Sequence, residues 1–216
     1  MTAFASGTTL LYLHGFRSSP ASVKARQVAA AVEALPAKCR PRLHVPTLHG
    51  GPASDMADVV AWIQSNVASP RHALTIIGSS LGGFYATHLA ERFDARAVLV
   101  NPAIRPYEDL RPYAGPQTNL YTGDTFIVTQ AHFTELQRLR VERITRPERY
   151  WLLVQTGDEV LDFSAAIAFY GGAFQYVQGG GDHAFQDFAQ QIPAILRFAG
   201  IVEDRRSCND RGAVRD

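Results

Sequence analysis

The sequence predicts an α/β fold, in which a mainly parallel β-sheet is covered on both faces by helices. Short apolar runs rich in β-forming residues alternate along the chain with helical patterns, as crossover connections between parallel strands require. The chain has 216 residues and is 46% hydrophobic, which is enough for one sizeable core. We therefore expect a single domain over residues 1–202.

Six runs have the length and composition of buried strands, and all are compatible with a parallel sheet. They cover residues 8–14, 42–47, 73–78, 96–101, 150–155 and 174–177. Helical patterns fill the intervals. We expect a first helix opened by Ser19-Pro20, a second capped by Ser54 or Asp55, a third from about residue 81 to 93, and a last over 185–198.

The alternation lapses between residues 103 and 149, where several prolines and glycines interrupt it. An amphipathic helix carrying Phe133, Leu136 and Leu139 follows in the same segment. This pattern is typical of a short cap inserted over a site. Residues 203–216 are charged and almost free of large apolar side chains, so we expect a flexible polar tail.

Composition excludes several classes of partner. The 21 basic and 20 acidic residues nearly cancel, so the charge balance favours neither nucleic acid nor a membrane surface. Two scattered cysteines, Cys39 and Cys208, indicate neither a disulfide framework nor a metal site. Without a signal-peptide pattern at the N-terminus, we expect a cytoplasmic protein that acts on a small molecule.

The segment Gly78-Ser79-Ser80-Leu81-Gly82 matches the pattern G-x-S-x-G between a predicted strand and a predicted helix. In that position the pattern predicts a sharp turn that exposes a nucleophilic serine, with glycines where strand and helix approach. Only Ser80 has a glycine two positions away on both sides. Ser80 is therefore the candidate nucleophile, with Gly78 and Gly82 as the glycines of the turn.

A serine hydroxyl needs a neighbouring base, and the base needs an acid that orients it. In the order expected for such a fold, serine, acid and then histidine, only His183 lies in a glycine-rich loop between the last strand and the last helix. Asp158, just after the strand 150–155, is the best-placed acid. Glu159 and Asp162 remain alternatives because a small change in the loop could bring either to the imidazole.

The oxyanion formed during acyl transfer needs preorganised N–H donors. The backbone N–H of Leu81 is one candidate, at the N-terminus of the helix after Ser80. The other is the N–H of Phe16, in the loop after the first strand, where Gly15 lets the backbone approach. We interpret His14 as a residue that organises this loop.

At these motifs the chain resembles the α/β-hydrolase superfamily and, more narrowly, the small YqiA-like bacterial esterases. The likeness rests on LLYLHGFRSSPAS, IIGSSLGGFYATHLAE, LVNPAIRPYEDL, TGDEVLD and GGGDHAF, and extends to about residue 199. It implies an α/β-hydrolase fold with about six strands and a short cap. It also implies a carboxylesterase without cofactor or metal, and supports Ser80, Asp158 and His183 as the catalytic residues.

Two other functions share these motifs. A thioesterase would use the same residues on a different leaving group, and arginines at 138, 140, 143, 146 and 149 could then bind the phosphates of an acyl-CoA. A solvated helix face explains the same arginines more simply. A non-catalytic ligand-binding protein on the same fold is the third hypothesis, although it would have little reason to keep all three residues.

Overall fold

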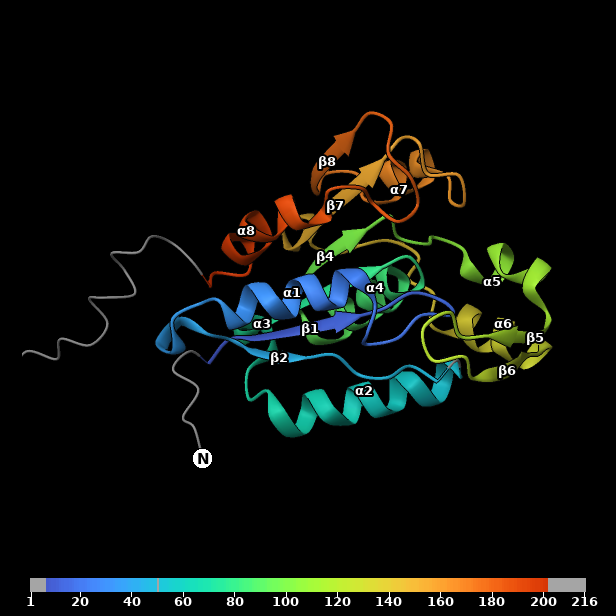
Figure 1. Cartoon of the computed structure of the whole chain (residues 1–216), viewed down its shortest axis with the longest axis horizontal. Coiled ribbons are helices and arrows are strands. Elements are labelled where there is room, and N and C mark those ends of the chain that lie inside the picture. Colours follow the sequence, from blue (N-terminus) through green and yellow to red (C-terminus); the bar gives the residue numbers. More distant parts are fainter. Residues whose placement is uncertain (1–6, 50, 202–216) are drawn as a thin grey trace, which may run out of the picture.

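A computed structural model describes residues 7–49 and 51–201, and its centre is a six-stranded parallel sheet in the order β2-β1-β3-β4-β7-β8 (Figure 1). The strands are β1 (Thr9–Leu13), β2 (Arg42–His44), β3 (Leu74–Ser79), β4 (Arg96–Val100), β7 (Tyr150–Gln155) and β8 (Phe174–Gln178). All six predicted strands are present. The parallel pairing places their carboxyl ends at one edge of the sheet.

The central strands form because their side chains are apolar on both faces. Every residue of β1 and β3 is buried, as expected for strands covered by helices on each side. Leu10 and Tyr12 of β1 pack into the core on one face, whereas Leu11 and Leu13 pack into the core on the other.

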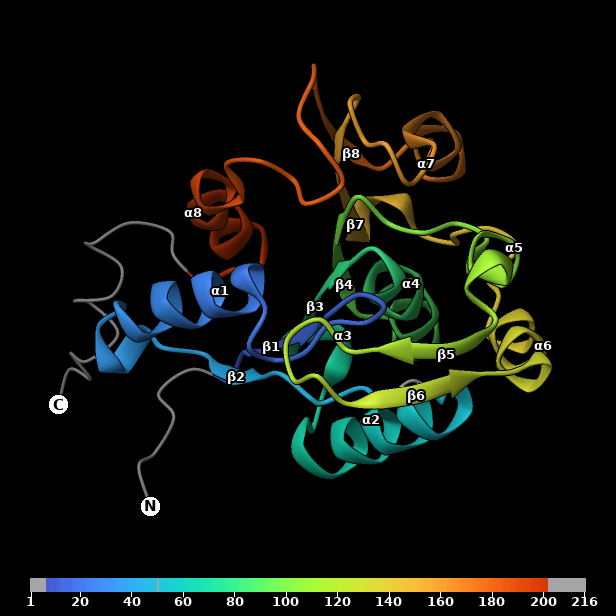
Figure 2. The ribbon, with the colours of Figure 1, turned by 45° about the vertical axis from the view of Figure 1, so that its right-hand side comes forward.

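Helices cover both faces of the sheet. On one face α1 (Val23–Glu33) lies beside α8 (Phe188–Phe198), and on the other lie α2 (Pro52–Asn66), α4 (Leu81–Phe93) and α7 (Phe163–Phe169) (Figure 2). A single turn, α3 (Pro70–Ala73), precedes β3. The predicted architecture of a helix-covered parallel sheet is thus confirmed.

Three predicted helix starts were wrong. The first helix begins at Val23 with Ser22 as N-cap, and α2 begins at Pro52 with Gly51 as N-cap. Proline suits the first helical position because a backbone N–H there has no acceptor within the helix, so its absence costs no hydrogen bond. The last helix begins only at residue 188 because Phe185 and Asp187 have φ angles of 62° and 61°, which a right-handed helix excludes.

The cap segment contains more regular structure than the sequence indicated. It comprises α5 (Pro106–Asp109), an antiparallel hairpin of β5 (Gly115–Thr118) and β6 (Thr125–Val128), α6 (Gln130–Arg138), and the short 3₁₀ turns η2 (Arg111–Tyr113) and η3 (Pro147–Arg149). A further 3₁₀ turn, η1 (Ala37–Cys39), follows α1. The predicted amphipathic helix is α6, which buries Phe133 and Leu136. The hairpin was not predicted because its strands are short and mostly exposed.

Cys39 is buried and disulfide-bonded, which corrects the expectation from two scattered cysteines. Spacing along the chain carries little information about such pairing, since it depends on which segments the fold brings together. The predicted polar tail over 203–216 lies outside the described residues. Among the described helices, each is too short or too polar to cross a membrane.

Candidate active site

Ser80 lies at the turn between β3 and α4, in a backbone conformation that L residues seldom adopt. Its φ and ψ angles are 55° and −121°. The neighbouring strand holds this turn, because the Ser80 N–H donates to the carbonyl of Val100 at 3.0 Å and the Ser80 carbonyl accepts from Ala103 at 3.1 Å. The surrounding fold therefore maintains a strained residue, as is common where a reactive side chain must project.

The two glycines of the motif are required by close packing. A Cβ on Gly78 would collide with the backbone of Gly82, and a Cβ on Gly82 would collide with the carbonyl of Leu13 in β1. Strand and helix can therefore approach only without side chains at these positions. This is the physical role that the sequence predicted for both.

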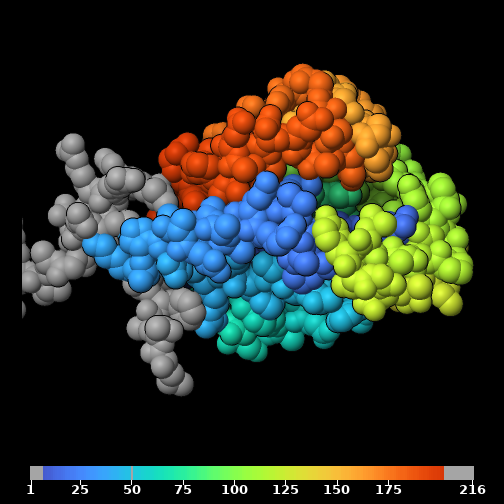
Figure 3. All heavy atoms as spheres, viewed as in Figure 1, coloured from blue at the N-terminus to red at the C-terminus, as the bar shows by residue number. Residues whose placement is uncertain are grey.

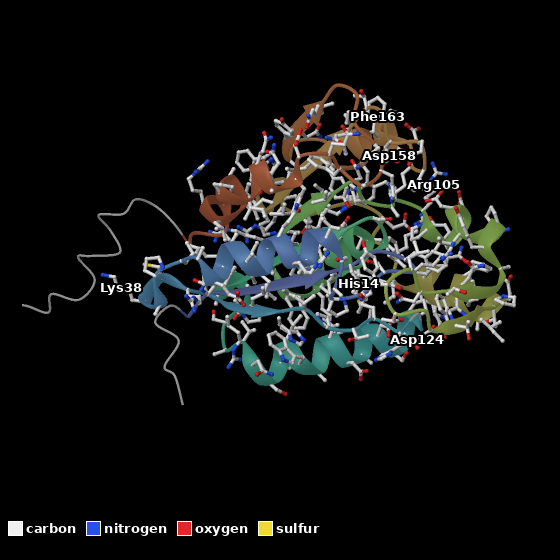
Figure 4. All side chains as sticks on the ribbon, viewed as in Figure 1. His14, Lys38, Arg105, Asp124, Asp158 and Phe163 are labelled. Carbon is white, nitrogen blue, oxygen red and sulfur yellow. The ribbon has the colours of Figure 1, made fainter. Side chains whose placement is uncertain are left out.

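The structure brings Ser80, His183 and Asp158 together at the carboxyl edge of the sheet. His183 Nε2 lies 3.1 Å from Ser80 Oγ, and His183 Nδ1 lies 2.9 Å and 3.0 Å from the two carboxylate oxygens of Asp158. Figure 4 labels Asp158 near the ends of the central strands, above His14. The three side chains form one continuous hydrogen-bonded chain.

The Asp158 carboxylate is ionised and well enclosed, its side chain being 2% exposed. Burial raises its pKa, but hydrogen bonds from His183 and from the backbone N–H groups of Leu161 and Val160 outweigh burial, so the pKa lies below its ordinary value. An ionised carboxylate only accepts hydrogen bonds. Nδ1 of His183 therefore carries the proton, and Nε2 presents its lone pair to Ser80.

The two alternative acids have other contacts. Glu159 accepts the backbone N–H of His183 at 3.0 Å through Oε2. Asp162 is the N-cap of α7 and accepts from the Ser164 N–H at 2.8 Å. Of the three candidates, only Asp158 makes a hydrogen bond to the imidazole ring.

Both predicted oxyanion donors lie beside Ser80. Leu81 is the first residue of α4, and in the described chain neither its N–H nor that of Phe16 donates to a protein acceptor. Gly15 packs against Ser80, since a Cβ there would lie 3.2 Å from Ser80 Cβ. The residue after Ser80 and the residue after Gly15 thus each have a backbone N–H without an acceptor in the described chain.

His14 orders the loop that carries Phe16. Its Nε2 accepts the backbone N–H of Leu48 at 3.2 Å, so Nδ1 carries the proton and donates to the Gly15 carbonyl at 3.0 Å. Burial lowers the pKa of His14, which favours this neutral form. The role of a loop-organising residue fits these contacts.

The cap is bonded to the same loop. Arg17, with φ of 55°, accepts the Leu120 N–H at 2.8 Å through its carbonyl and donates from Nε to the Thr118 carbonyl at 2.9 Å. The Asn119 amide donates to the Ser18 carbonyl at 2.7 Å. Three hydrogen bonds therefore join the hairpin of the cap to the residues that follow Phe16.

One cavity is lined by Ser80 and a second lies on the other side of Phe16, and Figure 3 shows the surface hollowed between the blue N-terminal segment, the orange C-terminal segment and the yellow-green cap. The larger, of about 760 Å³, is lined by Ser80 and His183 and by the start of α1. The smaller, of about 270 Å³, lies between Leu81 and the hairpin and is lined by Tyr85 and Phe126. Both are lined by Gly15 and Phe16, so the loop after β1 separates them.

Residues 9–200 match the model of the uncharacterised protein family UPF0227. The chain belongs to the UPF0227 family. Its resemblance to the YqiA-like group within the α/β-hydrolase superfamily is thereby confirmed.

Solved structures share the fold of this UPF0227 chain over most of its length. Monoacylglycerol lipase from Paleococcus ferrophilus is 14% identical, with a TM-score of 0.66, covering 90% of this chain and 95% of that one. Alpha/beta hydrolase domain-containing protein 10 from mouse is 16% identical, with a TM-score of 0.63 and coverage of 95% and 90%. Est1E from Butyrivibrio proteoclasticus is 13% identical, with a TM-score of 0.63 and coverage of 88% and 86%. These likenesses show the α/β-hydrolase fold.

Two residues that the sequence analysis did not single out hold the His183 loop of the UPF0227 chain. Gln155, fully buried at the end of β7, accepts the N–H groups of Asp182 and Gln186 at 3.1 Å and 2.8 Å through Oε1. Asn101, at the end of β4, donates to the carbonyls of Asp182 and His183 at 3.0 Å and 3.2 Å. In the sequence, the only sign of this role is that each of the two is a polar residue at the end of a buried, apolar strand.

The arginine series of the cap does not face the candidate site. Arg149 is buried and pairs with Glu91 and Asp94, and Arg146 also binds Asp94, at 3.0 Å. Arg140 pairs with Glu142. Among the described residues that line the two cavities on either side of Phe16, none belongs to this series. Their contacts give no support to the hypothesis that they bind phosphates.

Proposed function

We propose that this UPF0227 protein is a serine carboxylesterase that cleaves acyl esters through an acyl-enzyme intermediate. The observation that carries the proposal is the hydrogen-bonded chain from Ser80 through His183 to Asp158, beside two unused backbone N–H groups. This is the arrangement that acyl transfer by a serine requires. The esterase and lipase names of structurally similar proteins agree with it.

In the first step, His183 Nε2 accepts the proton of the Ser80 hydroxyl while Ser80 Oγ attacks the ester carbonyl carbon. The N–H groups of Leu81 and Phe16 stabilise the negative charge that develops on the carbonyl oxygen. Asp158 holds the imidazole with Nδ1 protonated and stabilises the imidazolium. The bond to the leaving oxygen then breaks, and that oxygen takes the proton from Nε2.

In the second step, water replaces the alcohol. His183 Nε2 accepts a proton from the water molecule as its oxygen attacks the acyl carbon on Ser80. The tetrahedral intermediate collapses, Ser80 Oγ recovers its proton from Nε2, and the carboxylic acid leaves. Each group on the protein returns to its starting state, so a single turnover consumes only ester and water.

Hydrolysis of p-nitrophenyl acyl esters from acetyl to palmitoyl, by wild type and by Ser80→Ala, tests the proposal. We expect activity in the wild type and a loss of about 10⁶-fold in kcat in the variant, as for removal of the serine in a related mechanism. Equal rates in both proteins, or none in either, would refute the proposal.

A further inference from the structure

Lys24 bonds the loop that carries the candidate base, and the mechanism above gives it no task. It is the second residue of α1, and it lines the larger cavity together with Ser80 and His183. Its Nζ donates to the carbonyl of Ala184, the residue after His183, at 2.7 Å. Because 160 positions separate the two partners in the sequence, this hydrogen bond forms only in the folded chain and joins α1 to the His183 loop.

The backbone on both sides of His183 has little local structure to hold it in place. Three glycines, residues 179–181, precede it in the loop, and the last two have φ angles of 72° and 76°. Phe185, on the other side, has a φ angle of 62°. Consecutive glycines leave the backbone much conformational freedom. The position of residues 182–184 between these turns therefore depends on hydrogen bonds to other parts of the fold.

The other hydrogen bonds to this segment come from the carboxyl ends of β4 and β7 and from the residue after Asp158. They reach the backbone groups of Asp182 and His183. Within the part of the chain that the structure describes, these bonds do not extend to Ala184, whose carbonyl is bonded by Lys24. The segment is thus held from the ends of the strands at its first two residues and from α1 at its third.

The amino group of Lys24 also lies close to the acidic groups of the candidate site. Burial lowers the pKa of Lys24, and the carboxylates of Asp182 and Asp158 act against that effect. A charged donor makes a stronger hydrogen bond to a carbonyl oxygen than a neutral donor does. The two carboxylates therefore favour the charged form of Lys24, which holds the carbonyl of the loop more firmly.

Resting on the esterase function proposed above, we propose that Lys24 is a positioning residue, which keeps His183 directed at Ser80 by fixing the Ala184 carbonyl. Nε2 of His183 lies 3.1 Å from Ser80 Oγ, and it has to serve both the serine and the leaving oxygen. A displacement of about 1 Å can cost about a hundredfold in rate. The Lys24 bond therefore affects the chemical step and not the binding of the ester.

Lys24→Met tests this assignment, because methionine keeps most of the length of the side chain and lacks the donor. We expect kcat for p-nitrophenyl butyrate to fall about 10- to 100-fold, while KM stays within about twofold of the wild-type value. Lys24→Arg keeps both N–H donors and positive charge, and it should bring kcat back to within about fivefold of the wild type. Recovery by arginine would trace the loss to the missing donor, since methionine preserves the apolar packing of the stem.

Arg26→Met is the matched control, because Arg26 is an exposed basic residue of the same helix and is not among the residues that line the cavity. It should change neither kcat nor KM. Lys24→Gln is a second variant, which stays polar but has a shorter side chain that ends before the Ala184 carbonyl. It should lose kcat as Lys24→Met does, so the test does not depend on methionine being tolerated. Thermal denaturation of each variant confirms that the protein assayed is folded.

Each outcome has a distinct meaning. A wild-type kcat in Lys24→Met or Lys24→Gln would overturn the positioning role and leave the esterase function intact. A raised KM at unchanged kcat would also overturn it, because Lys24 would then bind the substrate. Equal losses of kcat in Lys24→Met and Lys24→Arg would show that the donor is not what positions His183. Absence of hydrolysis of any ester by the wild type would remove the proposed function together with the inference.

Discussion

At the scale of single residues, the candidate site combines a nucleophile, Ser80, a base, His183, and an acid, Asp158. The hydrogen bonds of these groups determine where their protons lie. Asp158 is an acceptor because its pKa is lowered by hydrogen bonds that outweigh burial. That fixes the proton of His183 on Nδ1 and leaves Nε2 facing Ser80. A neutral amide at residue 158 could instead donate to Nδ1 and move the proton to Nε2.

Asp158→Asn should therefore lower kcat by about 10⁴-fold, as the corresponding change does in serine proteases, with little loss of folded protein. Steady-state hydrolysis of p-nitrophenyl butyrate measures it. Glu159→Gln is the matched control, because the Glu159 carboxylate accepts the backbone N–H of His183, whereas Asp158 binds the imidazole ring. We expect at most about a tenfold effect there. A larger loss in Glu159→Gln than in Asp158→Asn would reassign the acid.

The motif residues of the site were predictable and their supports were not. Ser80, Asp158 and His183 lie in local patterns with a known order along the chain, and the structure brings them together. Gln155 and Asn101 carry no local pattern, because their partners lie about 30 and 80 residues away in sequence and only the fold brings them near. Their role depends on tertiary contacts, which a single sequence does not display.

At the scale of elements, the strands were predicted well because burial on both faces gives a continuous apolar run. Every residue of β1 and β3 is buried, and both runs were evident in the sequence. The β5–β6 hairpin was not predicted, for the converse reason. It has four-residue strands with few buried side chains, so neither periodicity nor composition marks it. The predicted helix starts differ from the observed ones because turn geometry, and not apolar periodicity, decides where those helices begin.

The loop between β8 and α8 depends on the polar ends of β7 and β4 for its position. Gln155→Met should lower the free energy of unfolding by about 1–3 kcal/mol, because it leaves buried groups of the loop unpaired. It should also lower kcat by about 10- to 100-fold by displacing His183. Thermal denaturation and steady-state hydrolysis measure the two effects.

Gln175→Met is the matched control for this prediction. Gln175 lies on β8 and donates to the carbonyls of Ile167 and Tyr170, away from the His183 loop. We expect it to reduce stability without reducing kcat. If the two variants lower kcat equally, then Gln155 stabilises the fold without positioning His183.

At the scale of the whole molecule, folding encloses several histidines that would take up protons more readily when unfolded. Burial lowers the pKa of His14, His44 and His88. Between the lowered folded-state values and the unfolded value of about 6.5, the unfolded chain binds more protons. The stability that these neutral groups contribute is present above that unfolded value and is lost as the pH falls.

The free energy of unfolding should therefore decrease between pH 7.5 and pH 5.5, by at most about 1.4 kcal/mol per pH unit for each histidine. Urea denaturation at the two pH values measures the slope. His88→Gln should make it shallower, because it removes one of the groups whose pKa burial lowers. An unchanged slope in His88→Gln would show that burial of this imidazole is not linked to folding.

Ser80, and not its neighbour Ser79, should be the activated nucleophile of this fold. Mass spectrometry after treatment with a fluorophosphonate, which reacts with activated serines, tests it most directly on the wild type, Ser80→Ala and Ser79→Ala. We predict one phosphonyl adduct on the wild type, located at Ser80, an adduct also on Ser79→Ala, and none on Ser80→Ala. Labelling that persists in Ser80→Ala, or a wild type that stays unmodified, would show that Ser80 is not the activated nucleophile.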